Sequence, residues 1–288
     1  MSDPAALLGE LRAEGEELDA LVAGIGDRAW SAPTPAPGWT IAHQIAHLAW
    51  TDERALQAAT DPAGFAGEAA RAAAAPDSFV DEGAAEGARR APADLLRHWR
   101  TGRDRLLRAL AAQPPRARLP WYGPPMSVLS MATARLMETW AHGQDVADAL
   151  GVRRTPTARL RHVARIGVRA RDYAYAVRGL TPPEQEFRVE LSAPDGEVWS
   201  YGPAGPAPGS GPGRPGPDRV TGPALDFCLL VTQRAHRDDL ALRAEGPEAD
   251  RWLDIAQAFA GPPGPGRPPR GPAAGPHRAP AGTGGDAR

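Results

Sequence analysis

Glu138 and His142 stand four positions apart and offer a carboxylate and an imidazole to one site. On a helix, residues at i and i+4 project from the same face about one turn apart, so both side chains can reach a single ion. Imidazole and carboxylate groups are ligands that zinc and similar divalent ions accept. Asp145, three residues further on, shares this face and is a candidate to accept a hydrogen bond that orients the imidazole, to serve as an extra ligand, or to act as a base.

A second pair at the same spacing, His43 and His47, lies about ninety residues earlier along the chain. Three interpretations follow from the spacing. His47 joins Glu138 and His142 around one ion, or both histidines bind and Glu138 does not, or His47 is a core histidine bonded to a backbone carbonyl. Spacing by itself does not choose among them, because many such pairs are solvated or hydrogen-bonded surface pairs.

Two segments resemble a known family. Pro37-Gly-Trp-Thr-Ile-Ala-His-Gln-Ile-Ala-His-Leu-Ala49 resembles the second-helix signature of the DinB-like bundles, especially the mycothiol-dependent maleylpyruvate isomerase group, and residues 135–151 resemble its fourth-helix signature. The resemblance covers roughly residues 5–150. It implies that His47, Glu138 and His142 bind a divalent metal ion, and that His43 is not a ligand.

Three protein ligands leave coordination positions open, which is typical of a catalytic metal site. Zinc is the expected ion, and nickel, iron or manganese also suit these ligands. The resemblance implies mycothiol, a small thiol of actinobacteria, as the thiol cosubstrate. The implied reaction is cis–trans isomerisation or S-transfer on an activated alkene or carbonyl substrate. Cys228 lies in an apolar run and is expected to be buried, so the thiol must come from outside the chain.

Four further residues are candidates for the site. The resemblance implies that an arginine of the C-terminal domain assists catalysis, and we assign this role to Arg234, with Arg237 as its neighbour. Asp145 is the second catalytic candidate. For cofactor binding we select Arg135, which precedes Glu138 by one turn, and Trp121. Arg135 could instead be structural, and Trp121 could instead pack in the core.

Two other functions remain open. The first is a metal-dependent hydrolase or lyase that uses water and no thiol, with Asp145 as the base. The second is a non-enzymatic module that binds a metal ion or an apolar ligand. Activity of the metal-loaded protein without any thiol would favour the first.

The helices that must position these residues follow from apolar periodicity. We predict a first helix whose apolar stripe runs from Leu7 to Val22 and which stops near Gly24 and Gly26. Further helices are predicted from Thr40 to Ala59, from Phe79 to Ala112 and from Ser127 to Leu150, with Thr40 as an N-cap and Gly151 ending the last of them. A DinB-like four-helix bundle over residues 1–155 is expected. A connecting helix, Thr157 to Arg178, falls within residues 156–180.

After residue 180 the pattern becomes that of a small α+β domain, expected over 181–260 and loosely resembling sterol-carrier-like folds. Strands are predicted at 187–191, 197–201, 219–221 and 240–244, and helices at 224–232 and 247–259. Residues 202–217 are nearly all Gly and Pro and are expected to form a loop. In the tail, 261–288, 16 of 28 residues are Gly or Pro, which predicts disorder.

Composition excludes several classes of function. The net charge of −2 gives no case for nucleic acid or an anionic membrane as partner. No apolar run approaches the roughly 18 residues of a membrane span. The one cysteine excludes an internal disulfide and a Cys-rich zinc site. The acidic N-terminal segment is unlike a signal peptide. We therefore expect a cytoplasmic monomer or homodimer that acts on a small-molecule substrate and a small thiol.

Overall fold

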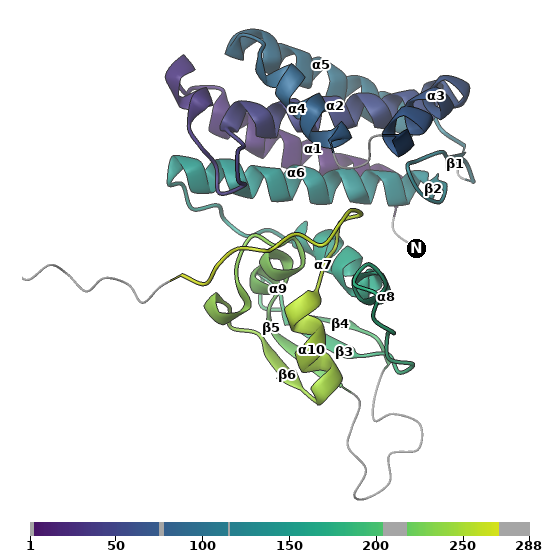
Figure 1. Cartoon of the computed structure of the whole chain (residues 1–288), viewed down its shortest axis with the longest axis vertical. Helices are drawn as coiled ribbons and strands as arrows, with labels where there is room; N and C mark the ends of the chain where they lie inside the picture. Colours follow the sequence, from purple (N-terminus) through teal and green to yellow (C-terminus); the bar gives the residue numbers. More distant parts are fainter. Residues whose placement is uncertain (1–2, 75–77, 115, 204–217, 271–288) are drawn as a thin grey trace, which may run out of the picture.

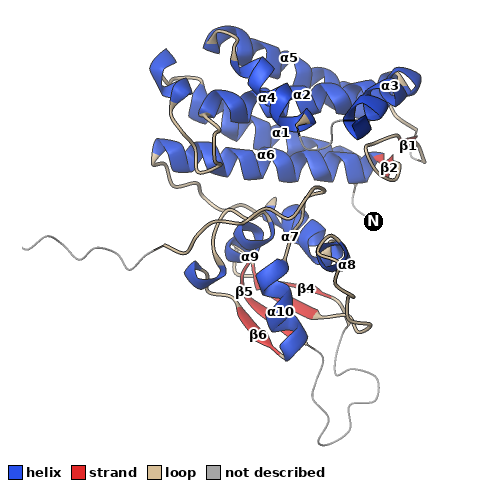
Figure 2. Cartoon of the chain, in the orientation of Figure 1, coloured by secondary structure: helices blue, strands red, loops and turns tan. Residues whose placement is uncertain are grey.

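The computed structural model describes residues 3–74, 78–114, 116–203 and 218–270. The described chain is mostly helical. A helical region at the N-terminal side is followed by a region that contains a four-stranded mixed sheet (Figures 1 and 2). In the described part of the chain, no helix is long and apolar enough to span a membrane.

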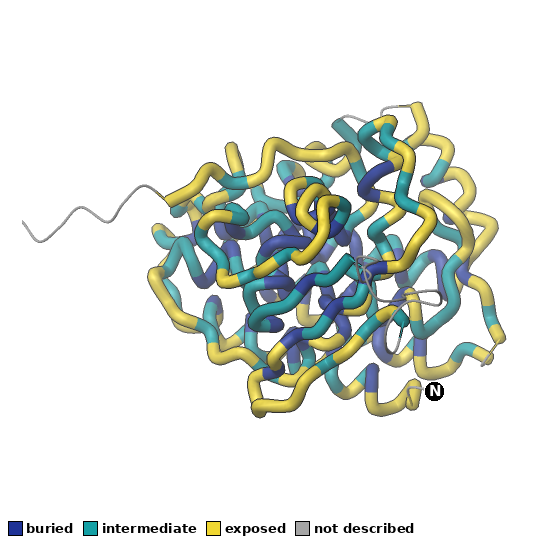
Figure 3. Tube along the Cα trace, turned by 90° about the horizontal axis from the view of Figure 1, so that it is seen from below, coloured by how far each residue is buried: buried dark blue, intermediate teal, exposed yellow. Residues whose placement is uncertain are grey.

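Four long helices form the frame of the helical region: α1 (Pro4–Val22), α2 (Ile41–Thr60), α5 (Pro92–Ala111) and α6 (Val128–Leu150). α2 packs against both α5 and α6, and α1 packs against α6 and α5. Their apolar faces meet in a buried interior that includes Leu18, Ile45, Leu48, Trp99 and Val146. Figure 3, seen from below, shows buried segments towards the middle of the molecule and exposed segments around its outside. These helices confirm four of the predicted helical segments, apart from the N-terminal part of the third.

Helix ends follow the expected capping chemistry. The backbone N–H of Thr40 donates to Nδ1 of His43 at 3.3 Å, so the His43 side chain caps the start of α2. The Ser127 hydroxyl accepts from the Ser130 N–H at 3.1 Å at the start of α6. Gly151 ends α6 with a φ of 67°, a left-handed conformation that glycine adopts without strain.

Two predicted helices are divided in the structure. The segment expected as one helix from Phe79 to Ala112 forms α4 (Phe79–Ala88) and then α5, because Pro92 has no N–H to donate and therefore starts a new helix. The segment 157–178 forms α7 (Leu160–Arg169) and α8 (Arg171–Ala176). The Ala-rich stretch before α4 contains an additional helix, α3 (Pro62–Ala74), in keeping with the helix propensity of alanine.

Short elements complete the helical region: the 3₁₀ turn η1 (Asp27–Ser31) and the two-residue strands β1 (Arg118–Leu119) and β2 (Met126–Ser127). β1 and β2 pair antiparallel and lead the chain into α6.

The sheet of the C-terminal region has the order β4-β3-β5-β6. Its strands are β3 (Arg188–Ser192), β4 (Val198–Tyr201), β5 (Arg219–Pro223) and β6 (Arg243–Glu245). β3 pairs antiparallel with β4 through the hairpin at Gly196, whose φ is 89°, and parallel with β5; β6 is antiparallel to β5. Each strand was predicted, although β6 begins at Arg243 and not at residue 240.

Helices pack on this sheet. α9 (Ala224–Val231) contacts β3 and β5, and α7 contacts β4 and α9, while α10 (Pro247–Ile255) lies beside β6. The short turn η2 (Arg237–Asp239) follows α9. α10 ends four residues before the expected end at residue 259. The buried core here centres on the side chains Val189, Leu191, Phe227, Trp252 and Leu253.

The expected disorder of the tail is wrong for residues 261–270. Within this segment Arg267 pairs with Asp145 and Asp148 of α6, and the Arg270 N–H donates to Asp239 at 2.9 Å. These charged contacts hold a Gly/Pro-rich segment that buries little apolar surface. Residues 271–288, and residues 204–217 of the expected loop, lie outside the described residues.

Candidate metal centre

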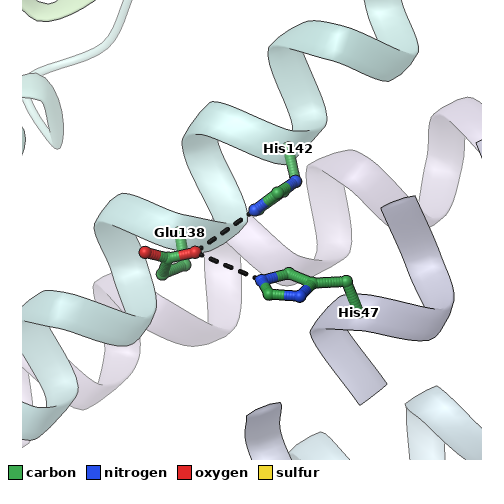
Figure 4. Close-up of side chains that lie close together, drawn as sticks. All are labelled: His47, Glu138 and His142. Carbon is green, nitrogen blue, oxygen red and sulfur yellow. Dashed lines mark hydrogen bonds and ion pairs between the residues drawn. The ribbon is translucent and has the colours of Figure 1, made fainter. Parts of the chain in front are cut away.

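His47, Glu138 and His142, hereafter the triad, converge between two helices (Figure 4). His47 comes from α2, while Glu138 and His142 come from successive turns of α6. Oε2 of Glu138 lies 3.2 Å from Nε2 of His142 and 3.5 Å from Nε2 of His47. One nitrogen or oxygen from each residue falls within 4.8 Å of the other two. Among the described residues, no other set of three His, Cys, Asp or Glu side chains converges in this way.

The spacing fits a divalent ion. Zinc takes imidazole nitrogens and carboxylate oxygens at about 2.0–2.2 Å, so tetrahedral ligand atoms stand about 3.3–3.5 Å from one another. The two measured separations between the Glu138 oxygen and the imidazole nitrogens agree with this value. Two neutral imidazoles and one carboxylate are the donor set of a site that keeps open coordination positions. The residues present therefore fit a catalytic-type metal centre.

A buried ion pair joins the two helices that carry the triad. Nε of Arg135 on α6 donates to Asp52 on α2 at 2.9 Å, and both residues are buried. Asp52 lies five residues after His47, and Arg135 lies three residues before Glu138. Burial raises the pKa of Asp52, against the lowering effect of Arg135. The pair fixes α2 against α6 close to the ligands.

The protonation states of Glu138 and His142 suit the binding of a cation. Burial raises the pKa of Glu138, but the neighbouring imidazoles of His142 and His47 outweigh this effect and hold that pKa well below its usual value. Burial, together with the neighbouring His47, lowers the pKa of His142 to about 4. Near neutral pH, Glu138 is therefore ionised and His142 is neutral, which is the state in which each binds a metal ion.

Aromatic rings cover the imidazoles. Trp39 stacks on His142 with ring centroids 5.8 Å apart and planes inclined by 18°, and it also lies 5.3 Å from the His47 ring. Its indole N–H donates to Asp81 of α4 at 3.1 Å. The Trp50 ring lies near His47 as well, with ring centroids 6.4 Å apart. Trp39 and Trp50 therefore shield the imidazoles of the triad. Neither had been assigned to the site from the sequence, although Trp39 lies in the segment that carries the resemblance.

The structure places Asp145 and Arg234 together, one turn from the triad. Asp145 is 1% exposed, and its two carboxylate oxygens are held by different guanidinium groups, one from Arg234 at 2.9 Å and one from Arg267. Arg234 also donates to the Thr232 carbonyl at 2.6 Å. Its charge is among those that lower the pKa of His142. The catalytic roles of Asp145 and Arg234 stay predictions.

The other candidates make no hydrogen bond or ion pair with the triad among the described residues. Arg135, one turn before Glu138, pairs instead with Asp52. Trp121 stacks on Phe65 with centroids 5.7 Å apart and lies in an aromatic cluster of α3, α4 and the loop before β2. His43 caps α2, which agrees with its exclusion from the ligands. Cofactor binding by Arg135 and Trp121 stays a prediction.

A helical region that brings two histidines and a glutamate to one point, followed by a mixed-sheet region, defines a two-part chain with a candidate divalent-metal centre. Residues 11–147 match the family described as the mycothiol maleylpyruvate isomerase N-terminal domain. The chain belongs to this family.

Two relatives come from Mycobacterium tuberculosis: the uncharacterized protein Rv0036c of strain H37Rv and the uncharacterized protein MT0041 of strain CDC 1551. Each is 57% identical over 267 residues, which cover 93% of this chain and 100% of the relative.

Crystal structures of the mycothiol-dependent maleylpyruvate isomerase, and of a histidine-to-alanine mutant of it, match with a TM-score of 0.56 at 16% identity. The match covers 86% of this chain and 96% of theirs, so the shared fold extends into the C-terminal region.

Proposed function

We propose that this chain is a divalent-metal-dependent enzyme that uses mycothiol for cis–trans isomerisation or S-transfer on an activated alkene or carbonyl substrate. The observation that carries the proposal is the convergence of the triad, at metal-ligand spacing, in a chain of this family. A divalent ion at such a centre acts as a Lewis acid that lowers the pKa of a thiol and favours its thiolate. The DinB-like and sterol-carrier-like fold assignments form part of the proposal, as does zinc.

The triad leaves one side accessible. The Glu138 side chain is 24% exposed, whereas those of His47 and His142 are 8% and 11% exposed. Trp39 and Trp50 lie beside the imidazoles. A small thiol and substrate would therefore approach past Glu138. The protein's own contribution is to present three donors at fixed positions.

The thiol has to come from outside the chain. Cys228 is completely buried in α9, and its Sγ donates to the Leu160 carbonyl at 3.4 Å. Burial raises the pKa of this thiol, so it stays protonated and is a poor nucleophile. The chain has no other cysteine.

Arg234 is the residue we propose to stabilise negative charge on the substrate. Its guanidinium comes from the C-terminal region and lies one helical turn from the triad, at Asp145. A carboxylate or developing enolate oxygen on the substrate is an acceptor that a guanidinium binds well. Because Asp145 has both oxygens engaged by arginines, it is better placed to hold Arg234 than to act as a free base. This favours the thiol enzyme over a hydrolase that uses Asp145.

The test combines metal analysis with thiol binding. We expect about one divalent ion per chain in the purified protein. We expect loss of that ion in a His47→Ala, Glu138→Ala double variant, and retention in a His236→Ala variant, whose side chain lies on the surface. Calorimetric titration with mycothiol should show binding only to the metal-loaded protein. Metal binding without thiol binding would favour the hydrolase, and absence of metal after reconstitution would leave a non-enzymatic module.

A further inference from the structure

Gln44 of α2 is completely buried beside the triad. Its Oε1 lies 2.5 Å from Nδ1 of His142, across the interface between α2 and α6. Its Nε2 donates to the hydroxyl oxygen of Thr34 at 2.9 Å. The Thr34 hydroxyl in turn donates to the Trp39 carbonyl at 2.9 Å. A polar chain therefore runs from the loop before α2 to the far nitrogen of a metal-ligand candidate.

The Trp39 carbonyl, which can only accept, sets the donor and acceptor of every hydrogen bond in this series. A backbone carbonyl can only accept, so the one proton of the Thr34 hydroxyl is used on the Trp39 oxygen. The Thr34 oxygen can then only accept from Gln44, which requires the amide NH₂ to face Thr34. The amide oxygen must face His142, and an oxygen there requires a proton on Nδ1 of the imidazole.

With its proton on Nδ1, a neutral His142 has a bare lone pair on Nε2. That nitrogen faces Oε2 of Glu138 at 3.2 Å, so two electron-rich atoms would confront one another with no proton between them. A cation between them converts this repulsion into ligation. Trp39 stacks on the ring face and limits its tilt. Among the described residues, Nδ1 of His47 has no hydrogen-bond partner. Of the two imidazoles, only that of His142 therefore has its tautomer and orientation set by a hydrogen bond to Nδ1.

We propose that Gln44, held by Thr34, is a positioning residue that fixes His142 as the Nδ1–H tautomer and directs its Nε2 lone pair at the metal position. The inference rests on the proposed function for the presence of the metal, but the tautomer is a property of the metal-free protein. Partners of this kind on metal-binding histidines raise ligand basicity and orient the ring, and their loss typically costs about 10- to 100-fold in metal affinity.

The first experiment is NMR of the histidine-labelled, metal-free protein at neutral pH. The two-bond ¹⁵N–¹H couplings of an imidazole distinguish the Nδ1–H from the Nε2–H tautomer. We expect His142 to be the Nδ1–H form in the native chain and a mixture in a Gln44→Leu variant. An Nε2–H tautomer of His142 in the native chain would overturn the proposal, whether or not the protein binds metal.

The second experiment measures Zn²⁺ affinity by competition with a chelator. Gln44→Leu keeps the volume of the side chain and removes the acceptor, so affinity should fall by about 10- to 100-fold. Gln44→Glu keeps an oxygen opposite Nδ1, and the Thr34 hydroxyl can turn from the Trp39 carbonyl to donate to the other carboxylate oxygen, so affinity should return to near the native value. Thr34→Val frees the amide to rotate and should give a smaller loss of the same sign. Gln113→Leu is the matched control, because Gln113 bonds the Ala59 carbonyl away from the triad.

The outcomes separate the two proposals. If the native chain binds no Zn²⁺, the proposed function fails, and the NMR measurement decides the role of Gln44. If the native chain binds Zn²⁺ and folded Gln44→Leu binds it equally well, the role of Gln44 is refuted and the metal centre stands. If Gln44→Leu does not fold, the Zn²⁺ affinity of Thr34→Val and the tautomer of His142 in the native protein test the role of Gln44 instead.

Discussion

At the scale of single residues, Glu138 is the one anionic group of the triad and lies next to both imidazoles. Glu138→Gln keeps its shape and removes its charge, so a bound cation loses its closest counter-charge. We expect Zn²⁺ affinity to fall by more than about 100-fold, beyond the typical effect of an outer-shell partner. Chelator competition measures it. Glu53→Gln is the control, since Glu53 pairs with His98 at the surface; equal affinities for native and Glu138→Gln protein would show that Glu138 is not a ligand.

His142 predicts a pH dependence of stability in the metal-free protein. Its pKa is about 4 in the folded chain and about 6.5 when unfolded. The unfolded state therefore binds more protons between these values, so the free energy of unfolding is unaffected by His142 above pH 6.5 and falls as the pH drops towards 4. The loss should not exceed about 3 kcal/mol. Glu138, with its lowered pKa, adds a loss only below its usual range.

Urea unfolding with a chelator present, at several pH values, measures this effect. The difference between native and His142→Gln protein isolates His142 from other titrating groups, such as the buried Asp52. His236→Gln, a change at the surface, should keep the native pH dependence. A native protein whose difference from His142→Gln is constant between pH 6.5 and 4.5 would contradict the prediction.

The triad could be predicted from the sequence, because helical spacing pairs Glu138 with His142 and two local signatures identify all three residues. Gln44 was missed, although one signal could have revealed it. It lies three residues before His47 on a helix rich in apolar residues, so it shares the buried face of a ligand, where an amide needs partners. Arg267 gave no such signal, because nothing in a Gly/Pro-rich tail indicates that it contacts Asp145.

At the scale of elements, the Asp52–Arg135 pair holds α2 against α6. Arg135→Met leaves a buried carboxylate without its partner and should destabilise the protein by about 3–5 kcal/mol. The double variant Asp52→Leu, Arg135→Met removes both charges and should recover much of this loss. Denaturant unfolding measures both effects. Arg12→Met is the control, because its pair with Asp104 is half exposed and worth under about 1 kcal/mol.

The same variants test the role of the two helices in the metal centre. If the pair sets the register of α2 on α6, Arg135→Met should also weaken Zn²⁺ binding, and the double variant should restore part of it. Unchanged stability in Arg135→Met would contradict the structural role of the pair. A change in mycothiol binding without a change in stability would instead support the predicted contact of Arg135 with the cofactor.

Elements were predictable where their signals are local. Caps and apolar stripes place α2 and α6 within one residue, whereas the stripe of α1 begins three residues after the helix does. Asp195-Gly196, a dipeptide typical of hairpin turns, lies between β3 and β4. The parallel pairing of β3 with β5 was not predictable, because it joins strands separated by more than twenty residues. The break before α5 was missed although Pro92 signals it, because the Ala-rich stretch before Pro92 is also compatible with a helix; the apolar stripe of α5 begins only at Leu95.

At the scale of the whole molecule, charged groups link the helical region to the C-terminal region. Glu14, buried in α1, is held by Arg154 and Arg159 of the segment that connects α6 to α7. Asp145 on α6 is held by Arg234 and by Arg267. A buried carboxylate that loses its partner stays charged in a poorly solvated site, which lowers the free energy of unfolding. The arrangement of the two regions is therefore sensitive to single arginines.

The segment 261–270 should contribute to this arrangement although it has no secondary structure. A chain ending at residue 260 loses Arg267, so one oxygen of Asp145 loses its guanidinium partner. We expect a loss of about 1–3 kcal/mol in the free energy of unfolding. Arg267→Met should reproduce most of it. A chain ending at residue 270 keeps the contact and is the matched control.

Denaturant unfolding of these chains, with limited proteolysis between α6 and α7 as a second readout, tests the prediction. Loss of stability and faster cleavage in the 1–260 chain and in Arg267→Met, but not in the 1–270 chain, would establish that the tail anchors the C-terminal region to α6. Equal behaviour of the 1–260 and 1–270 chains would show that Arg234 alone suffices to hold Asp145. In that case Arg267 would be dispensable, and the two regions would be joined through Arg234 and the Glu14 cluster.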